Sequence, residues 1–139
     1  MSPQLFVDLD GVFGPEEFSP EQKPYLNGRI AWQFLRLLYH PNPIILTGVH
    51  FDKPDIVHQK IQWVRKHISS RAMVICCRSV DKCHYGKPGD ILIDDRVKYR
   101  DLWVNMGGVF ILHTSWASTF SGLSSLPSLH TTPAPRTRF

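Results

Sequence analysis

The sequence predicts an α/β fold, namely a three-layer Rossmann-like core on a five-stranded parallel sheet. Five short apolar runs, typical of buried strands, alternate with segments whose apolar residues recur at helical spacing. Strands that alternate with helices favour a parallel sheet with right-handed crossovers. Three of the five runs end in aspartate or threonine. Because ligands bind beyond the carboxyl ends of strands in open sheets, these residues indicate a site at one edge.

The size and charge of the chain narrow the class of protein. Its 139 residues suit one domain with one core. The net charge of +4 is compatible with a solvated basic surface or with attraction of an anionic substrate, such as a nucleotide or a nucleic acid end. No apolar run approaches the roughly 20 residues of a membrane span, and the N-terminus lacks the features of a signal peptide. We therefore expect a cytoplasmic protein that binds no membrane.

The three cysteines, Cys76, Cys77 and Cys83, are an odd and sparse set that does not indicate a disulfide framework. With His84 they could be imagined as a zinc cluster. The spacing matches no paired C-x-x-C pattern, and neighbouring residues of a strand point to opposite faces. We therefore expect ordinary buried or half-buried thiols.

The N-terminal half contains two of the predicted strands and two of the predicted helices. Glycine and prolines mark the loop that follows the first strand, and Asp52 or Lys53 could start the second helix, with Pro54 in its first turn. The first helix is predicted by apolar residues at helical spacing, Leu26, Ile30, Phe34, Leu37 and Leu38. In chain order, the elements are strand 4–9, loop 13–24, helix 25–39, strand 44–48 and helix 52–69.

The C-terminal half contains the other three strands, separated by a polar stretch and one helix. Gly107 and Gly108 end this helix. In chain order, the elements are strand 72–77, a polar stretch through Pro88, strand 90–95, helix 97–106 and strand 109–112.

From Ser115 the composition shifts to serine, threonine and proline, which divides the chain into a domain over 1–114 and a C-terminal segment over 115–139. We expect part of this segment to pack on the core and its last ten residues to be poorly ordered. The residues expected to pack are Trp116, Phe120, Leu123 and Leu126.

The strand ends bring together Asp8, Asp10, Thr47, Asp94 and Asp95. Four carboxylates at one edge repel one another, so the arrangement is costly without a cation. Mg²⁺ prefers oxygen ligands and keeps several waters, and it would resolve this repulsion. The sequence therefore predicts Mg²⁺ as the cofactor.

In that setting the residues suit phosphoryl transfer. Asp8 can attack phosphorus as a carboxylate nucleophile, and Asp10 can protonate the leaving oxygen and then activate water. Thr47, with the amide of Gly48, can bind phosphoryl oxygens, and a lysine would offset their charge. Each motif also has an ordinary reading as a loop or helix cap. Their conjunction at successive strand ends is much more specific.

These motifs resemble those of the haloacid dehalogenase (HAD) superfamily. Asp8-Leu9-Asp10-Gly11-Val12 is similar to its motif I, Leu46-Thr47-Gly48 to motif II and Ile93-Asp94-Asp95-Arg96 to motif IV. The resemblance spans residues 4 to about 114. The stretch from Lys82 to Arg96 is similar to the 5′(3′)-deoxyribonucleotidase branch, and polynucleotide phosphatases share the same pattern.

The resemblance implies a role for each residue at the sheet edge. Asp8 would be the nucleophile and Asp10 the acid and base, while Thr47 would bind phosphate. Asp94 would hold Mg²⁺ together with the Asp8 carboxylate and the backbone carbonyl of Asp10, and Asp95 would assist directly or through water.

Motif III needs one lysine, and both Lys82 and Lys87 precede the fourth strand. We favour Lys82, since related proteins place the lysine at the start of this segment. Lys87 precedes Pro88, and capping a loop would be enough to account for it.

The resemblance implies a Mg²⁺-dependent phosphomonoesterase that acts on nucleotides, as 5′-nucleotidases do. Only about 37 residues separate Asp10 from Thr47, which leaves room for a minimal cap or none. An open site also suits a polynucleotide end phosphatase. The alternative class is a binding or regulatory module without turnover, and the presence of every catalytic residue favours the enzyme. Candidates for contacting the base or sugar are Phe13, Phe18, His50, Phe51, Arg96 and His113.

Overall fold

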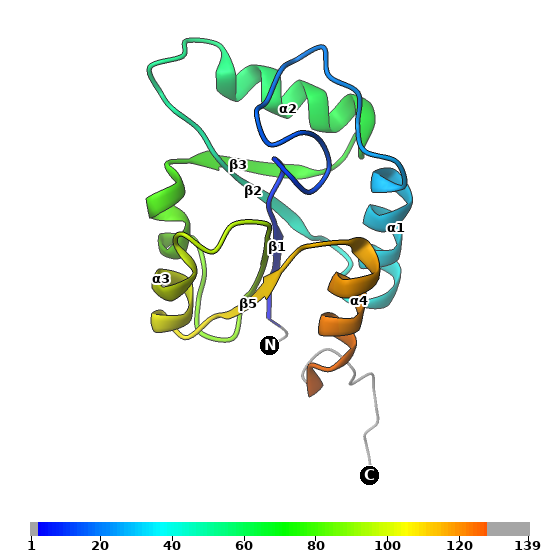
Figure 1. The fold of residues 1–139 in the computed structure, drawn as a ribbon, viewed down its shortest axis with the longest axis vertical. Helices are drawn as coiled ribbons and strands as arrows, with labels where there is room; N and C mark the ends of the chain where they lie inside the picture. The colour runs from blue at the N-terminus through cyan, green and yellow to red at the C-terminus, as the bar shows by residue number, and fades with distance from the viewer. Residues whose placement is uncertain (1–2, 128–139) are drawn as a thin grey trace.

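A five-stranded, all-parallel, open sheet forms the centre of the protein, with helices on both faces (Figure 1). The structure is a computed structural model and describes residues 3–127. The α/β class and the five parallel strands predicted from the sequence are confirmed. The sheet order is β3-β2-β1-β4-β5. The strands are β1 (Leu5–Val7), β2 (Ile44–Gly48), β3 (Met73–Cys77), β4 (Ile91–Asp94) and β5 (Val109–Leu112).

The helices that cover the sheet are short. The described residues form α1 (Gly28–Leu38), α2 (Ile56–His67), the 3₁₀-helix η1 (Ser79–His84), α3 (Arg100–Asn105) and α4 (Trp116–Ser124). Within residues 3–127, none of these helices has the length and apolar character that crossing a membrane requires.

Alternating side chains of the strands build two cores, one on each face of the sheet. In β1, Leu5 and Val7 point into a core that also takes side chains from α1, α2 and α4. Phe6 points to the other face and packs with Leu92 and with Trp103 of α3. Strands that are buried on both faces are largely apolar, and the polar residues Thr47 and Asp94 fall at or near the ends of their strands. The result is three layers, with α1, α2 and α4 on one side and η1 and α3 on the other (Figure 1).

Three helix starts differ from the prediction; one of them is α3, which begins at Arg100 where 97 was predicted. Residues 51–55 form turns and α2 begins at Ile56, so the predicted start at Asp52 or Lys53 is wrong. The amide of Lys53 donates to the carbonyl of His50 at 3.1 Å, which closes a turn instead of a helical repeat. Likewise α1 begins at Gly28, where 25 was predicted, and Asn27 before it adopts a left-handed conformation with φ 70°.

The apolar residues that predicted α1 are not the ones it buries. Its buried face consists of Gly28, Ala31, Trp32 and Leu35. Trp32 fixes this orientation, since its indole packs edge-on against Phe13 beneath the helix. The residues with helical spacing in the sequence lie on the exposed side, Leu26, Ile30, Phe34, Leu37 and Leu38.

Two helical elements lie where the sequence analysis assigned no secondary structure. The polar stretch before β4 contains η1, and the segment after Ser115 begins with α4. The Ser115 hydroxyl caps α4 by accepting from the amide of Ser118 at 3.1 Å. Leu123 of α4 is buried, and Trp116, Phe120 and Leu126 pack against the same core. Residues 128–139, on which the prediction of poor order falls, lie outside the described residues.

Phe13 provides a test of this packing. Its ring is fully buried and contacts the rings of Trp32 and Trp116, with centroids at 6.1 and 5.3 Å. We predict that Phe13→Ala lowers the free energy of unfolding by about 3–5 kcal/mol, the usual cost of truncating a buried aromatic ring. Urea unfolding followed by tryptophan fluorescence measures this.

Phe51→Ala is the matched control, because the Phe51 side chain is 60% exposed. Its free energy of unfolding should stay within about 0.5 kcal/mol of the unmodified protein. Equal effects of the two substitutions would contradict the packing of Phe13 in the core.

Candidate active site

Three adjacent strands bring polar side chains to one edge of the sheet. Asp8 follows β1 directly, and its amide continues the β1–β4 pairing by donating to the carbonyl of Ile93 at 2.8 Å. Thr47 lies near the end of β2, and Asp94 is the last residue of β4. Since β1 lies between β2 and β4, the three side chains converge, and all three are buried.

The turn after Asp8 carries Asp10 and packs closely against Asp95, which follows β4. Gly11 has φ +78°, a conformation that residues with a side chain rarely adopt. A Cβ atom at Gly11 would also collide with the carboxylate of Asp95. The amide of Gly11 donates to the carbonyl of Gly14 at 2.7 Å and closes the turn. The glycine that follows the two aspartates is therefore required for the close approach of Asp95.

Asp8, Asp94 and Asp95 form an acidic cluster whose oxygens lie within 4.8 Å of one another. Burial, and then the neighbouring Asp8 carboxylate, raise the pKa of Asp94 to about 6. Burial also raises the pKa of Asp8, against the opposing effect of Lys82. Oδ1 of Asp95 is buried without a hydrogen-bond partner among the described residues. Clustered carboxylate oxygens are the ligands that a hard divalent cation such as Mg²⁺ prefers, and the unpartnered Oδ1 of Asp95 is free to bind one.

Lys82 lies between two of these carboxylates. Its Nζ is 2.9 Å from Oδ1 of Asp8 and 3.0 Å from Oδ2 of Asp94, and η1 places it in a buried position. Burial by itself lowers the pKa of this lysine, but the two carboxylates outweigh that effect and hold the pKa well above its ordinary value. Lys82 is therefore charged and contacts the candidate nucleophile directly.

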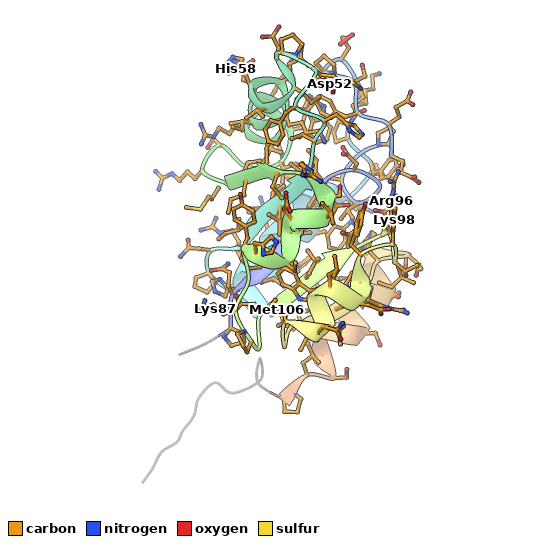
Figure 2. The ribbon with its side chains drawn as sticks, turned by 90° about the vertical axis from the view of Figure 1, so that its left-hand side faces the viewer. Asp52, His58, Lys87, Arg96, Lys98 and Met106 are labelled. Carbon is orange, nitrogen blue, oxygen red and sulfur yellow. The ribbon has the colours of Figure 1, made fainter. Side chains whose placement is uncertain are left out.

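Lys87, the other candidate for the motif III lysine, lies away from the site. Its side chain is 72% exposed and pairs at 3.5 Å with Asp90, which precedes β4 at the opposite end of that strand. Figure 2 shows Lys87 well separated from Arg96, which follows the acidic cluster in the chain. Of the two lysines, the structure brings only Lys82 to the carboxylates.

A second buried lysine, Lys60, belongs to the site and was missed in the sequence. Its Nζ donates to Oδ2 of Asp10 at 2.7 Å, to Oγ1 of Thr47 at 3.1 Å and to the carbonyl oxygen of Gly48 at 2.8 Å. Burial raises the pKa of Asp10, and Lys60 is the largest opposing influence.

A signal for Lys60 was present in the sequence. Lys60 is four residues after Ile56 and four before Val64, so it falls on the apolar stripe of α2. A lysine at that position must bury its ammonium group, and a buried charge needs partners.

The site opens into a cavity of about 750 Å³. Of the residues considered for base or sugar contacts, Phe18, His50 and Arg96 line it. Phe13 does not, because it is part of the core, and neither does His113, whose Nδ1 is hydrogen-bonded to the Thr119 hydroxyl at 2.6 Å in a buried position. Phe51 is exposed and lies outside the cavity lining.

The cavity mouth is bordered by cations and by the loop that follows Gly14. In that loop, Glu16 pairs with Arg96 at 2.8 Å, and the ring of Phe18 lies 5.4 Å from the ammonium of Lys60. Further basic residues line the cavity, His50, Lys53, Arg78 and Lys98. The acids Glu16 and Glu17 also line the cavity, but apart from the buried carboxylates the basic residues outnumber the acidic ones, which favours an anionic ligand.

Comparison with models of known protein families, with curated proteins and with solved structures finds no match to this chain. The geometry of the site limits the chemistry that it can perform. A buried carboxylate, Asp8, contacts a charged lysine and lies beside two further carboxylates. A fourth carboxylate, Asp10, has a separate ammonium partner. This arrangement can bind a divalent cation together with an anionic group.

The acidic cluster generates a prediction about metal binding. Mg²⁺ at ten times its dissociation constant should stabilise the protein by about 1.4 kcal/mol, which corresponds to about 5 °C in Tm. The shift should be smaller at pH 5 than at pH 7.5. The pKa of Asp94 is raised to about 6, so a proton competes with the metal at the lower pH. Thermal unfolding with and without MgCl₂ measures both effects.

Asp94→Asn should abolish the Mg²⁺-dependent shift in Tm. Asp101→Asn is the control and should keep it, because Asp101 is 89% exposed and lies outside the cavity lining. An equal shift in the two variants would show that Mg²⁺ binds elsewhere.

Proposed function

We propose that this protein is a Mg²⁺-dependent phosphomonoesterase of the HAD type, which forms an aspartyl-phosphate and acts on nucleotides. The observation that carries the proposal is the position of Asp8. Its carboxylate lies at the end of the central strand, in contact with the ammonium of Lys82 and beside Asp94 and Asp95. Phosphoryl transfer through an aspartyl-phosphate needs a carboxylate nucleophile, with positive charge from a cation and a metal to offset the charge on the phosphoryl oxygens.

The first half-reaction uses Asp8 and Asp10. A carboxylate oxygen of Asp8 attacks phosphorus, and the bond between phosphorus and the leaving oxygen breaks with its electron pair. Asp10 gives its proton to that oxygen, which leaves as an alcohol. Lys82 and the Thr47 hydroxyl stabilise the charge on the phosphoryl oxygens. Bound Mg²⁺, held by Asp8, Asp94, Asp95 and the backbone carbonyl of Asp10, would supply further positive charge.

The second half-reaction reverses these roles. Asp10, now a carboxylate, takes a proton from water as the water oxygen attacks phosphorus. The bond between phosphorus and Asp8 breaks, inorganic phosphate leaves, and both aspartates return to their initial forms. Both half-reactions need Asp8 and Asp10 to reach the same substrate. Both residues line the cavity, which agrees with this requirement.

The mouth of the cavity favours a nucleotide or a related anion as the substrate. Phe18, His50 and Tyr99 line the cavity and offer rings on which a base can stack, worth about 1–3 kcal/mol per base. Lys53 and Lys98 add positive charge.

A second candidate is a phosphatase of polynucleotide ends. Residues 3–127 form no cap domain above the cavity, and the basic residues that line it could contact phosphates that neighbour the terminal one. Turnover of oligonucleotides, unlike that of mononucleotides, would then fall steeply with added salt.

We also propose a cytoplasmic location. Cys76, Cys77 and Cys83 are free thiols, and burial raises the pKa of Cys77 to about 11, which keeps it protonated and unreactive. Free cysteines suit a reducing compartment.

A phosphate-release screen tests the proposed function. The substrates are nucleoside monophosphates, oligonucleotides phosphorylated at the 3′ or 5′ end, and sugar phosphates, each with Mg²⁺ and with EDTA. We predict Mg²⁺-dependent release, with larger kcat/KM for nucleotides or nucleic acid ends than for sugar phosphates.

Asp8→Asn is the control for the screen, because it removes the nucleophile while keeping the shape of the side chain. Release by this variant should fall below a few per cent of the unmodified value. Full activity in the variant or in EDTA would refute the mechanism, whereas a preference for sugar phosphates would refute only the substrate class.

Lys82 and Lys87 form a matched pair for a separate test. Lys82→Ala should lower kcat/KM by about 10²-fold or more, which is the scale of one charged partner of the transition state, about 3 kcal/mol. Lys87→Ala should change it less than about threefold, since its side chain is 72% exposed at the opposite end of β4. The reverse ranking, measured by steady-state kinetics on one nucleotide, would contradict the assignment of Lys82.

A further inference from the structure

The ammonium group of Lys60 has used all of its hydrogen-bond donors. It carries three N–H groups, and the structure gives it three acceptors, on Asp10, Thr47 and Gly48. The side chain is 3% exposed, and the ring of Phe18 lies over the ammonium. Lys60 therefore has no donor left for a phosphoryl oxygen, in contrast to a lysine that binds substrate directly.

The contact with Asp10 makes the two oxygens of that carboxyl group unequal. Oδ2 accepts from Lys60 at 2.7 Å, and an oxygen that faces an ammonium group is a poor place for a proton. Oδ1 is buried and has no hydrogen-bond partner among residues 3–127. When Asp10 carries a proton, that proton therefore belongs on Oδ1.

The contact with Thr47 has a similar consequence. Oγ1 of Thr47 is 3.1 Å from the Lys60 ammonium, which has no lone pair and can only donate. The hydroxyl must therefore direct its own hydrogen elsewhere. Thr47 itself is completely buried and is not part of the cavity lining, but Gly48 and Lys60 beside it are. Among residues 3–127 its hydroxyl hydrogen has no acceptor, which leaves it for a group that enters beside Gly48.

We propose that Lys60 is a positioning residue that holds the Asp10 carboxyl group by Oδ2 and leaves Oδ1 as the oxygen that carries the proton. The inference rests on the proposed function of Asp10 as acid and base. Lys60 acts through Asp10 and touches neither the substrate nor the nucleophile. Its place on the buried stripe of α2 makes it rigid, because the helix packs on the core through Trp63 and Val64.

Leaving-group dependence separates this role from a merely structural one. An alkyl phosphate, such as a nucleoside monophosphate, needs the proton of Asp10 to release its alkoxide, whereas p-nitrophenyl phosphate has a leaving group that departs without it. The parameter is kcat/KM, which reports formation of the aspartyl-phosphate and not its hydrolysis. Lys60→Met should lower kcat/KM by about 10²-fold for the nucleotide and by less than about fivefold for p-nitrophenyl phosphate.

A double variant tests whether Lys60 acts through Asp10. With the nucleotide, Lys60→Met added to Asp10→Asn should change kcat/KM by less than about twofold, since the proton donor is already absent. Lys66→Met is the matched control, an exposed lysine on the same helix, and should leave both substrates unaffected. If Lys60→Met fails to fold, kcat/KM of Lys60→Gln is measured with the same two substrates. This variant keeps a hydrogen-bond donor at position 60. It should show the same preference with a smaller loss.

Two kinetic results would overturn the inference. One is an equal loss for both substrates in the Lys60 variants. The other is a further large loss when Lys60→Met is combined with Asp10→Asn. Either result would show that Lys60 supports the fold or the phosphate site in general.

A crystal structure of Lys60→Met tests the positioning of Asp10 without relying on activity. If the unmodified chain shows no phosphatase activity, the proposed function is refuted, and the crystal structure still tests the positioning role. The expected result is that Oδ2 of Asp10 leaves its present position while Asp8 and Asp94 keep theirs. An unmoved Asp10 would show that Lys60 does not position it.

Discussion

The structure depends on the compensation of like charges at the carboxyl end of its sheet. Asp8 and Asp94 are buried there, and Asp10 and Asp95 approach them from the following loops. Carboxylates this close to one another favour their protonated, neutral form unless cations lie nearby to stabilise the ionised form. Two buried lysines supply part of the positive charge, and each comes from the segment between two strands: Lys60 from α2 and Lys82 from η1. The crossover connections thus serve the site as well as the sheet.

Each lysine serves a different pair of groups. Lys82 lies between Asp8 and Asp94, where phosphorus would be attacked, while Lys60 contacts Asp10 and Thr47 on the opposite side. A buried ion pair adds little net stability to a fold. Removing one partner nevertheless destabilises the protein strongly, because the remaining charge stays buried. Stability alone therefore does not explain two such pairs, since apolar residues would serve as well. The proposed function accounts for their positions, since Lys82 lies beside the proposed nucleophile and Lys60 beside the proposed acid.

The fold and the carboxylates could be predicted from the sequence because both depend on local patterns. A continuous apolar run indicates a strand buried on both faces, and the polar residue at its end falls on a known edge of a parallel sheet. Asp8, Thr47 and Asp94 were found in this way. The faces of α1 could not be predicted, since Ile30 and Phe34 match the helical period as well as the buried Trp32 and Leu35 do. Only the packing of Trp32 on Phe13 decides between them.

Lys60 shows why part of the site escaped prediction and how such residues can be found. A lysine within a helix is ordinarily exposed, so its residue type suggests a solvated face. Its spacing from Ile56 and Val64 suggests the reverse, because positions four residues apart share a face of the helix. When residue type and spacing conflict, a partner must be present to satisfy the buried charge, and the acids at the neighbouring strand ends are the groups able to do so. A lysine on the apolar stripe of the helix that follows a Thr-Gly strand end is therefore a signal for a site, which neither the lysine nor the Thr-Gly pair indicates alone.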